Sequence, residues 1–277
     1  MGLRIATNIA SQSVQKNLKE VSNAGTSQLE KLSSGKRITK ASDDAAGLAI
    51  ATNLEAQTKG LRQATRNAND GISLIQTAEG GLNETSSILI RLRELTIQAA
   101  SDTVGEQERG FLDKEYQQLT KEVDRISEST TFNGSQLLNG KGKGTMDFQV
   151  GAFAGEQNKI TFDSNETDAS TSSIGVSGTG VSSKDDALGA IASVDMAITK
   201  VSGQRANLGS IQSRLGSTVK NLETQTINQD SARSVIQDVD VAEASAALAS
   251  NSVVKNAAVS TLAQANQIPN SALRLIS

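Results

Sequence analysis

A long, regular spacing of apolar and small residues in the first half of the chain restricts what it can fold into. Such residues recur in alternating steps of three and four, separated by Arg, Glu, Gln, Asn and Thr. A seven-residue repeat of this kind gives a helix one apolar seam, as in a coiled coil. The predicted helix covers about residues 42–100 and would be about 85 to 90 Å long, too long for a small globule. Its predicted seam positions are Leu54, Gln57, Leu61, Ala64, Ala68, Gly71, Ile75, Ala78, Leu82, Thr85, Leu89, Leu92, Thr96 and Ala99.

Two further amphipathic runs are expected to pack against this helix. A polar break at residues 101–109 precedes the first run, which should fold back antiparallel and end at the turn sequence TFNG, residues 131–134. The other run resumes the repeat at Leu188 and ends near Ile236. The predicted seam positions of the two runs are Leu112, Tyr116, Leu119, Val123 and Ile126, and then Leu188, Ile191, Val194, Ile198, Val201, Arg205, Leu208, Ile211, Leu215, Val219 and Leu222.

The segment between these runs changes in character. Residues 146–150 and 159–162 alternate apolar and polar side chains and enclose a loop with glycines, so a β-hairpin is predicted at about 140–163. Residues 164–184 are rich in Ser, Thr and Gly and are predicted to form an exposed loop.

Both ends of the chain favour helix but contain few bulky residues. Because a lone amphipathic helix gains most of its stability from a partner, the two ends are expected to pair with each other and with copies of the same chain. Pro269, the only proline, is expected to break the last helix. This gives an inner terminal helical domain of residues 1–42 with 238–277, and a rod domain of residues 43–237. The apolar positions assigned to assembly are Ile5, Ile9, Val14, Leu18, Val254, Val259, Leu262 and Leu273.

The composition argues against catalysis. The chain has no cysteine and no histidine, which removes thiolate nucleophiles, Cys/His metal sites and the commonest general base. With 27 basic and 30 acidic residues interspersed along the chain, neither nucleic acid nor an anionic membrane is an expected partner. No run is long enough to span a membrane, and the first residues lack the apolar core of a cleavable signal peptide. We therefore expect no catalytic residue, cofactor or metal.

The stretch SSGKRITKASDDAAGLAIA, residues 33–51, allows two interpretations. A phosphate-binding loop would need a second upstream glycine and a hydroxyl residue after the lysine, where this chain has an arginine. The favoured interpretation is a joint between helices: a glycine ends the first helix, and Ser42 or Asp43 caps the next. The residues assigned to this hinge, and to contacts between subunits, are Gly35, Lys36, Arg37, Lys40, Asp43 and Asp44.

Motifs at both ends of the chain resemble those of bacterial flagellins. In the first half they are LEKLSSGKRITKASDDAAGLAIA, NANDGISLIQTAEGGLNE, RLRELTIQAA and TFNG; in the second half they are LGSIQSRL, SARSVIQDVDVAEAS and STLAQANQIPNSALRLI. The resemblance implies a mainly α fold: an elongated antiparallel helical rod with a small β-hairpin region, and paired terminal helices. The middle segment is too short for the outer domains that many flagellins carry, so the chain resembles a minimal flagellin.

The resemblance also implies a function and partners. The chain would polymerise into the flagellar filament, outside the cell and exported without a cleaved signal. It would meet an export chaperone through its C-terminal helix, the filament cap and the hook-junction proteins. Arg91, Leu95 and Glu115 match the surface read by an innate Toll-like receptor. The Ser/Thr cluster Ser170, Thr171, Ser172 and Ser173 is either O-glycosylated or a plain solvated loop. A hook–filament junction protein and a coiled-coil binding module that does not polymerise remain the alternatives.

Overall fold

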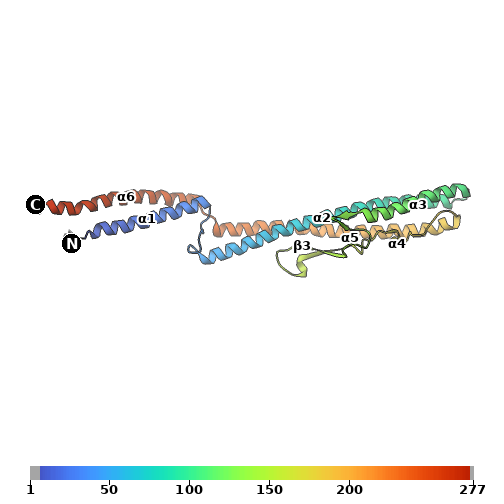
Figure 1. Cartoon of the computed structure of the whole chain (residues 1–277), viewed down its shortest axis with the longest axis horizontal. Helices are drawn as coiled ribbons and strands as arrows, with labels where there is room; N and C mark the ends of the chain where they lie inside the picture. The colour runs from blue at the N-terminus through green and yellow to red at the C-terminus, as the bar shows by residue number, and fades with distance from the viewer. Residues whose placement is uncertain (1–6, 275–277) are drawn as a thin grey trace. The chain divides into compact units, whose positions relative to one another are not determined.

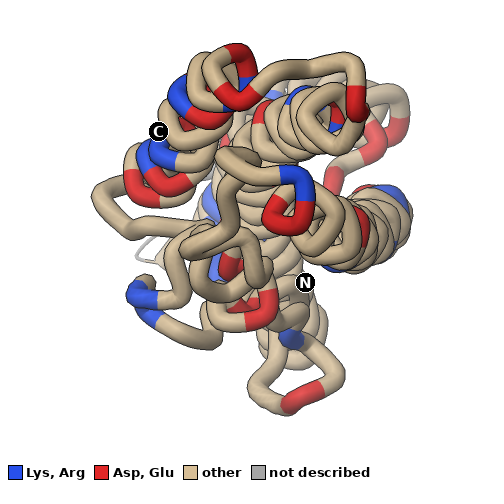
Figure 2. Tube along the Cα trace, turned by 90° about the vertical axis from the view of Figure 1, so that its right-hand side faces the viewer, with Lys and Arg blue, Asp and Glu red and all other residues tan. Residues whose placement is uncertain are grey.

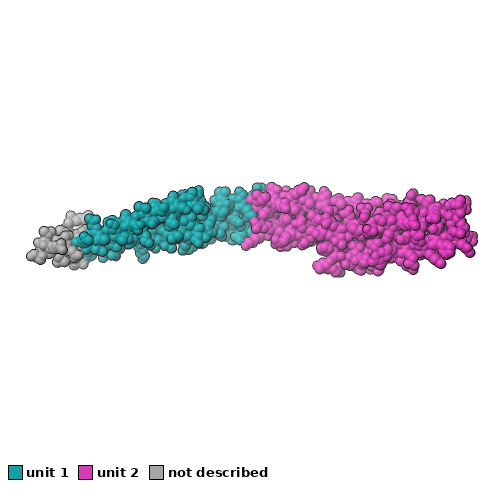
Figure 3. Space-filling model, turned by 90° about the horizontal axis from the view of Figure 1, so that it is seen from above, with its two compact units in different colours: residues 1–56, 228–277 teal, residues 57–227 magenta. Residues whose placement is uncertain are grey.

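The computed structural model of this 277-residue chain describes residues 7–274, with side chains to residue 267. The chain divides into two compact units (Figure 3). Unit 1 comprises residues 1–56 and 228–277, and unit 2 comprises residues 57–227. The division falls inside the two longest helices, α2 (Ala45–Ala100) and α5 (Lys184–Gln237), whereas the sequence-based boundary was placed at the connectors that precede α2 and follow α5.

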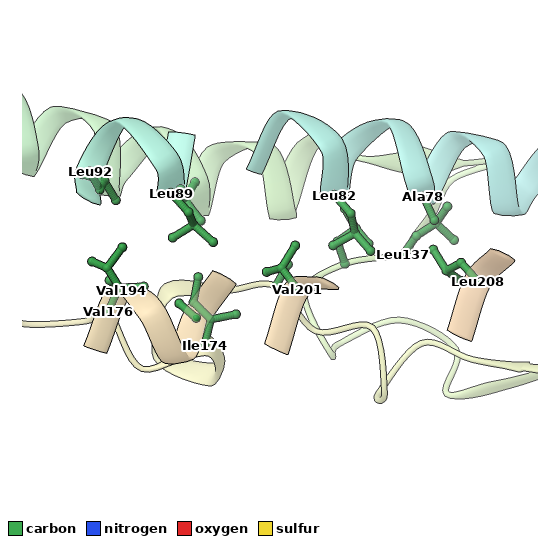
Figure 4. Packing of buried hydrophobic residues seen from close by; sticks show 14 of the residues in the cluster. Ala78, Leu82, Leu89, Leu92, Leu137, Ile174, Val176, Val194, Val201 and Leu208 are labelled. Carbon is green, nitrogen blue, oxygen red and sulfur yellow. The ribbon is translucent and has the colours of Figure 1, made fainter. Parts of the chain in front are cut away.

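Unit 2 is a bundle formed by α2, α3 (Glu106–Ser129) and α5 (Figure 1). Apolar side chains of α2 point toward those of α5 and toward the irregular segment after α3 (Figure 4). Every predicted seam position of α2 from Leu61 to Ala99 is buried, which confirms the heptad prediction over this stretch. The first two predicted positions, Leu54 and Gln57, are only half-buried. The single tyrosine, Tyr116 of α3, is also fully buried, with its hydroxyl 2.7 Å from Thr179 Oγ1.

The predicted seam of α5 is partly wrong. Leu188 is 51% exposed, whereas its neighbours Ala187 and Ala190 are almost completely buried. Further along, Ala197 and Gln204 are buried in place of the predicted Ile198 and Arg205, which are only half-buried. The prediction followed the bulkier residue at each step, but the buried alanines let the helices approach closely, and the bulkier neighbours lie at the edge of the seam. Gln204 is buried with its Nε2 donating to the carbonyl of Asp168 at 2.9 Å.

Two small antiparallel sheets follow α3. Strands β1 (Thr131–Phe132) and β2 (Ser135–Gln136) are joined by Asn133 and Gly134, whose φ angles of 49° and 75° are those of a tight hairpin turn. Strands β3 (Thr145–Gln149) and β4 (Lys159–Asp163) pair from Thr145↔Asp163 to Gln149↔Lys159. A short 3₁₀ turn, η1 (Glu156–Asn158), precedes β4. The second sheet confirms the predicted hairpin.

The expectation of an exposed loop at residues 164–184 is wrong. Ala169, Ile174, Val176 and Val181 are at most 4% exposed and belong to the core of unit 2. The short helix α4 (Thr171–Ile174) lies within this segment. Its Ser and Thr residues give it a polar composition, but their polar atoms bond to α3 and to neighbouring backbone, so the few apolar residues can be buried.

In unit 1, α1 (Ile9–Ser34) and α6 (Val241–Arg274) run side by side (Figure 1). They are antiparallel, because Asn8 at the start of α1 contacts Ala265 near the end of α6. The predicted break at Pro269 is wrong, since α6 continues past it to Arg274. A proline inside a helix removes one backbone donor and leaves the carbonyl four residues earlier, here that of Ala265, without its helical partner.

Candidate functional site

The connector between α1 and α2 pairs with the connector between α5 and α6, and we call residues 35–44 and 236–240 the connector clasp. Lys36 and Asp238 form an antiparallel β-bridge. Arg37 N donates to the carbonyl of Gln237 at 2.7 Å, and Val239 N donates to that of Gly35 at 3.1 Å. The Arg37 side chain also donates from Nη2 to the carbonyl of Ile236 at 2.6 Å. Arg37 thus satisfies carbonyls that the end of α5 leaves without an intrahelical donor.

Asp43 closes a hydrogen-bonded turn in the first half of the clasp. Asp43 Oδ2 accepts from Thr39 N, Thr39 Oγ1 and Lys40 N, each at 3.0 Å. These hydrogen bonds, first those from the two backbone amides, hold the pKa of Asp43 below its ordinary value. The prediction that Ser42 or Asp43 caps α2 is wrong. The cap is Asp44, whose Oδ1 accepts from Gly47 N at 2.8 Å. Asp43 closes the turn before the cap, so the prediction was out by one residue.

Lys40 of the clasp also has a partner inside the chain. Lys40 Nζ lies 2.7 Å from Glu30 Oε2, and this hydrogen bond and ion pair raise the lysine pKa. Gly35 ends α1 in the left-handed conformation with φ of 68°, as predicted. The arrangement is therefore an ordered junction between four helix ends and has none of the hydroxyl and glycine geometry of a phosphate-binding loop.

Sequence reasoning missed the second half of the clasp. Asp240 Oδ1 accepts from Ala242 N at 2.8 Å and caps α6. Glu243 stands three residues later, and this D-x-x-E spacing is a helix-start signal that could have located the residue. The pairing of the two connectors leaves no local signal, because it joins residues about 200 positions apart.

The paired terminal helices expose much of their apolar surface. Ser11 is the only described side chain of α1 that is buried. Of the residues assigned to assembly, Val14, Leu18 and Leu262 are half-buried, whereas Ile9, Val254 and Val259 are 60%, 46% and 49% exposed. Ile5 and the side chain of Leu273 lie outside the described part of the chain.

The residues assigned to receptor recognition lie on α2 and α3. Arg91 donates from Nη2 to Glu115 Oε1 at 2.8 Å and from Nη1 to Glu94 Oε2 at 2.9 Å, and its hydrogen bond to Glu115 is the main cause of its raised pKa. Arg91 and Glu115 are about half exposed. Leu95, in contrast, is fully buried in the core, so a partner could sense it only through its effect on the surface.

The cluster proposed for glycosylation lies in and beside α4. Ser170 caps this helix by accepting from Ser173 N at 3.4 Å, and Thr171 Oγ1 donates to Asp124 Oδ2 at 2.8 Å. Ser173 accepts a contact from Lys200 Nζ at 3.1 Å. Ser172 is the one exposed member, which makes it the most accessible of the four hydroxyl groups.

Among the described residues, no group of three or more acidic side chains is placed to hold a metal ion. None of the helices in this part of the chain is long and apolar enough to cross a membrane. Basic and acidic residues are interspersed along the backbone (Figure 2). A bundle of long helices, a capped junction and terminal helices with exposed apolar side chains define the class of a helical structural protein that associates with other chains.

Comparison with known proteins identifies the family. Sequence models of the bacterial flagellin N-terminal and C-terminal helical regions match residues 5–143 and 191–276. A flagellin of Halalkalibacterium halodurans is 41% identical over 97% of this chain and 98% of its own length. The flagellar filament core protein flaB2 of Brachyspira hyodysenteriae is 38% identical over 98% of this chain and 99% of its own. The crystal structure of Bacillus cereus flagellin, 32% identical, matches with a TM-score of 0.51 over 61% of this chain and 94% of that one. The chain belongs to the bacterial flagellin family.

Proposed function

We propose that this chain is the structural subunit of a bacterial flagellar filament and that α1 and α6 form the contacts between copies. The chain is a structural protein and not an enzyme, as its family membership establishes. Relatives of nearly the same length that are named flagellin or filament core protein support polymerisation with itself. As a filament protein it belongs to the flagellum, outside the cell.

One observation carries the assignment of the terminal helices. Val253, Val254 and Val259 on one helix, and Ile9 and Leu29 on the other, are between 46% and 69% exposed. A helix pair this thin cannot bury apolar side chains on both of its sides. Exposed apolar surface of this extent marks a site of association, and a filament subunit meets further copies of itself at high local concentration. These exposed apolar side chains are therefore the contact surface of the polymer.

Several partners belong to this proposal. The C-terminal helix, with its exposed valines, suits the groove of an export chaperone, and export would proceed without a cleaved signal. The filament cap and the hook-junction proteins would meet the same helix ends. An innate Toll-like receptor would meet Arg91 and Glu115, which are exposed and paired across α2 and α3. Arg91→Ala should then reduce receptor signalling by monomers while leaving the unfolding temperature nearly unchanged, because exposed ion pairs contribute little to stability.

Seeded assembly tests the main proposal. Purified full-length chain is mixed with short filament fragments and followed by light scattering and negative-stain electron microscopy. Growth of long tubes from the fragments is the expected result. A sample that stays monomeric or dimeric under these conditions would instead be a coiled-coil binding module. One that adds to hook ends without elongating would be a junction protein.

A further inference from the structure

The side chain of Asn8 both caps α1 and joins it to α6 near the two chain ends. Asn8 Oδ1 accepts from Ser11 N at 3.0 Å and caps α1. The same amide donates from Nδ2 to the carbonyl of Ala265 on α6 at 2.9 Å. Both bonds form only when the oxygen faces the amide donor and the nitrogen faces the carbonyl, so the two contacts fix the orientation of the Asn8 side chain.

The carbonyl to which Asn8 donates is the one that the only proline in the chain leaves without a helical donor. In an α-helix the carbonyl of residue 265 accepts from the N–H of residue 269. Residue 269 is Pro269, which has no N–H, although α6 continues past it. Ala265 is only 5% exposed, so its carbonyl would otherwise be left unsatisfied at the interface. Asn8 supplies the missing donor from the other helix.

Packing alone gives this helix pair little reason to prefer one register. The side chain of Ser11, the one buried residue of α1, is polar, and its Oγ donates to Asn266 Oδ1 at 2.8 Å. The described buried residues of α6 are the small Ala244 and Ala265. These polar contacts are partly buried, and a slipped alignment would take their groups away from these partners, so they favour one register.

The clasp holds the opposite ends of the same helices in a matching alignment. Asn8 contacts Ala265 at one end of the helix pair, and Lys36 contacts Asp238 at the other. The two segments between these contacts have nearly the same number of residues. The two helices are therefore tied at both ends without a difference in length. A slip of one turn would break the contacts at Asn8 and strain those of the clasp.

We propose that Asn8, Ser11, Asn266 and Pro269 form a register lock that fixes the alignment of α1 on α6. Pro269 leaves the carbonyl of Ala265 without its usual donor in α6, and the side-chain amide of Asn8 donates to this carbonyl instead. Asn8 is thus a positioning residue. By fixing the alignment, the lock also fixes which apolar side chains form the surface offered to the next copy, a consequence that rests on the proposed function.

Cross-linking between introduced cysteines measures the register directly, because the chain has no cysteine of its own. In the full-length chain, Ser11→Cys with Asn266→Cys reports the native alignment. Ser11→Cys with Leu262→Cys reports an alignment shifted by one turn. Both pairs remove the Ser11–Asn266 bond, so register in this background depends on Asn8. Each pair is oxidised in unseeded and in seeded samples, and the yields are compared.

The informative variant is Asn8→Ser, which keeps a capping oxygen but is too short to reach Ala265. We expect the ratio of 11–266 to 11–262 product to fall about tenfold, a factor that corresponds to about 1.4 kcal/mol. In a Pro269→Ala background the new backbone N–H can bond the Ala265 carbonyl, and Asn8→Ser should then change the ratio by less than about twofold. A general loss of helix stability would lower both yields together and would not depend on residue 269.

An unchanged product ratio in Asn8→Ser overturns the lock, as does an equal effect of this variant in both backgrounds. Absence of the 11–266 product with Asn8 intact overturns it as well. These results are separate from the proposed function, because filaments are scored by electron microscopy. Filaments with a ratio insensitive to Asn8 refute the lock alone, and an Asn8-dependent ratio without filaments refutes the filament proposal alone.

Discussion

Gly47, in the first turn of α2, has much less room for a side chain than Gly35, the glycine of the connector clasp. A Cβ atom there would lie 2.8 Å from Ile38 Cδ1 and closer still to Asp44 Oδ2. Ile38 is only 2% exposed, and Asp44 caps the helix by bonding to Gly47 itself. The requirement for glycine is therefore one of space, imposed by a buried neighbour and a cap on the same turn.

Gly47→Ala should lower the free energy of unfolding by about 1–2 kcal/mol, because the cap is lost and Ile38 is displaced. Gly25→Ala is the matched control: it is also in a helix, and a Cβ there meets nothing within 4 Å. The control should gain about 0.5–1 kcal/mol from reduced backbone freedom in the unfolded chain. Thermal unfolding followed by circular dichroism measures both changes. Equal effects of the two substitutions would contradict the steric explanation.

The carboxylate of Asp43 makes the clasp sensitive to acid. Its pKa is lowered from 3.8 by hydrogen bonds from the amides of Thr39 and Lys40. A group whose pKa is lower in the folded state contributes stability above its unfolded pKa, and this contribution is lost as the pH falls through the folded value. We expect the contribution of Asp43 to be complete above pH 3.8 and to disappear below it.

Asp43→Asn should flatten the pH dependence of unfolding in this acidic range, because the amide does not titrate. Unfolding temperatures of both proteins between about pH 2 and 6 would show it, since the ordinary aspartate pKa lies within this range. Asp185→Asn, in the first turn of α5, is a control for removing one carboxylate from a helix start. Identical pH profiles for Asp43→Asn and the unmodified chain would exclude this role.

At the scale of elements, the two longest helices end in a similar way. Arg109 donates to the carbonyl of Ala99 in the last turn of α2 and to that of Ser101 just after the helix, at 2.8 and 2.9 Å. Arg37 donates to Ile236 at the end of α5. In both cases an arginine from another segment satisfies the last carbonyls, and its charge is favourable at the negative end of the helix dipole.

The segment at residues 164–183 is held to α3 by the carboxylate of Asp124. Its oxygens accept from Thr171 N at 2.9 Å and from Thr171 Oγ1 at 2.8 Å, which fixes the start of α4. Nearby Ile174 and Val176 then fill the core beside α5 (Figure 4). A polar segment is packed here because one side chain of a neighbouring helix satisfies its backbone and hydroxyl groups.

Asp124→Ala should release this segment, because it leaves the amide and hydroxyl of Thr171 without their acceptor. Limited proteolysis is expected to cut within residues 164–183 at least about tenfold faster, in proportion to the larger open population. Glu128→Ala, an exposed position on the same helix, is the control and should leave the cleavage rate unchanged. Cleavage that is equally slow in both variants would show that apolar packing alone holds the segment.

The sequence could predict elements whose signal is local and repeated. The seam of α2 is predictable because its apolar residues recur over many turns, and the turn at Asn133 and Gly134 is predictable from its residue types. The buried alanines of α5 were missed because small residues carry a weak apolar signal. The role of Asn8 and the packing of residues 164–183 depend on partners far along the chain, Ala265 and Asp124, which no local pattern reveals.

At the scale of the whole molecule, the two compact units differ in where their apolar residues lie. Unit 2 encloses a continuous core that includes fully buried Leu, Ile, Val, Phe and Tyr side chains. In unit 1 the described buried residues are few and mostly small, and large apolar side chains of α1 and α6 are exposed. Unit 2 can therefore fold by its own packing, whereas unit 1 needs association to bury its apolar surface.

Deleting residues 250–277 separates these properties, because it removes most of α6 and leaves unit 2 complete. We expect the shortened chain to stay folded, with a cooperative unfolding transition from unit 2, and to be unable to elongate filament fragments. A milder variant, Val254→Asp, places a charge at an exposed apolar position and should slow elongation, whereas Ser252→Asp at a nearby exposed polar position is its control. Elongation rates from light scattering, with tubes counted by electron microscopy, measure all three. Normal filaments from the shortened chain would mean that the contacts between copies lie in unit 2, and the exposed valines of α6 would then need another partner.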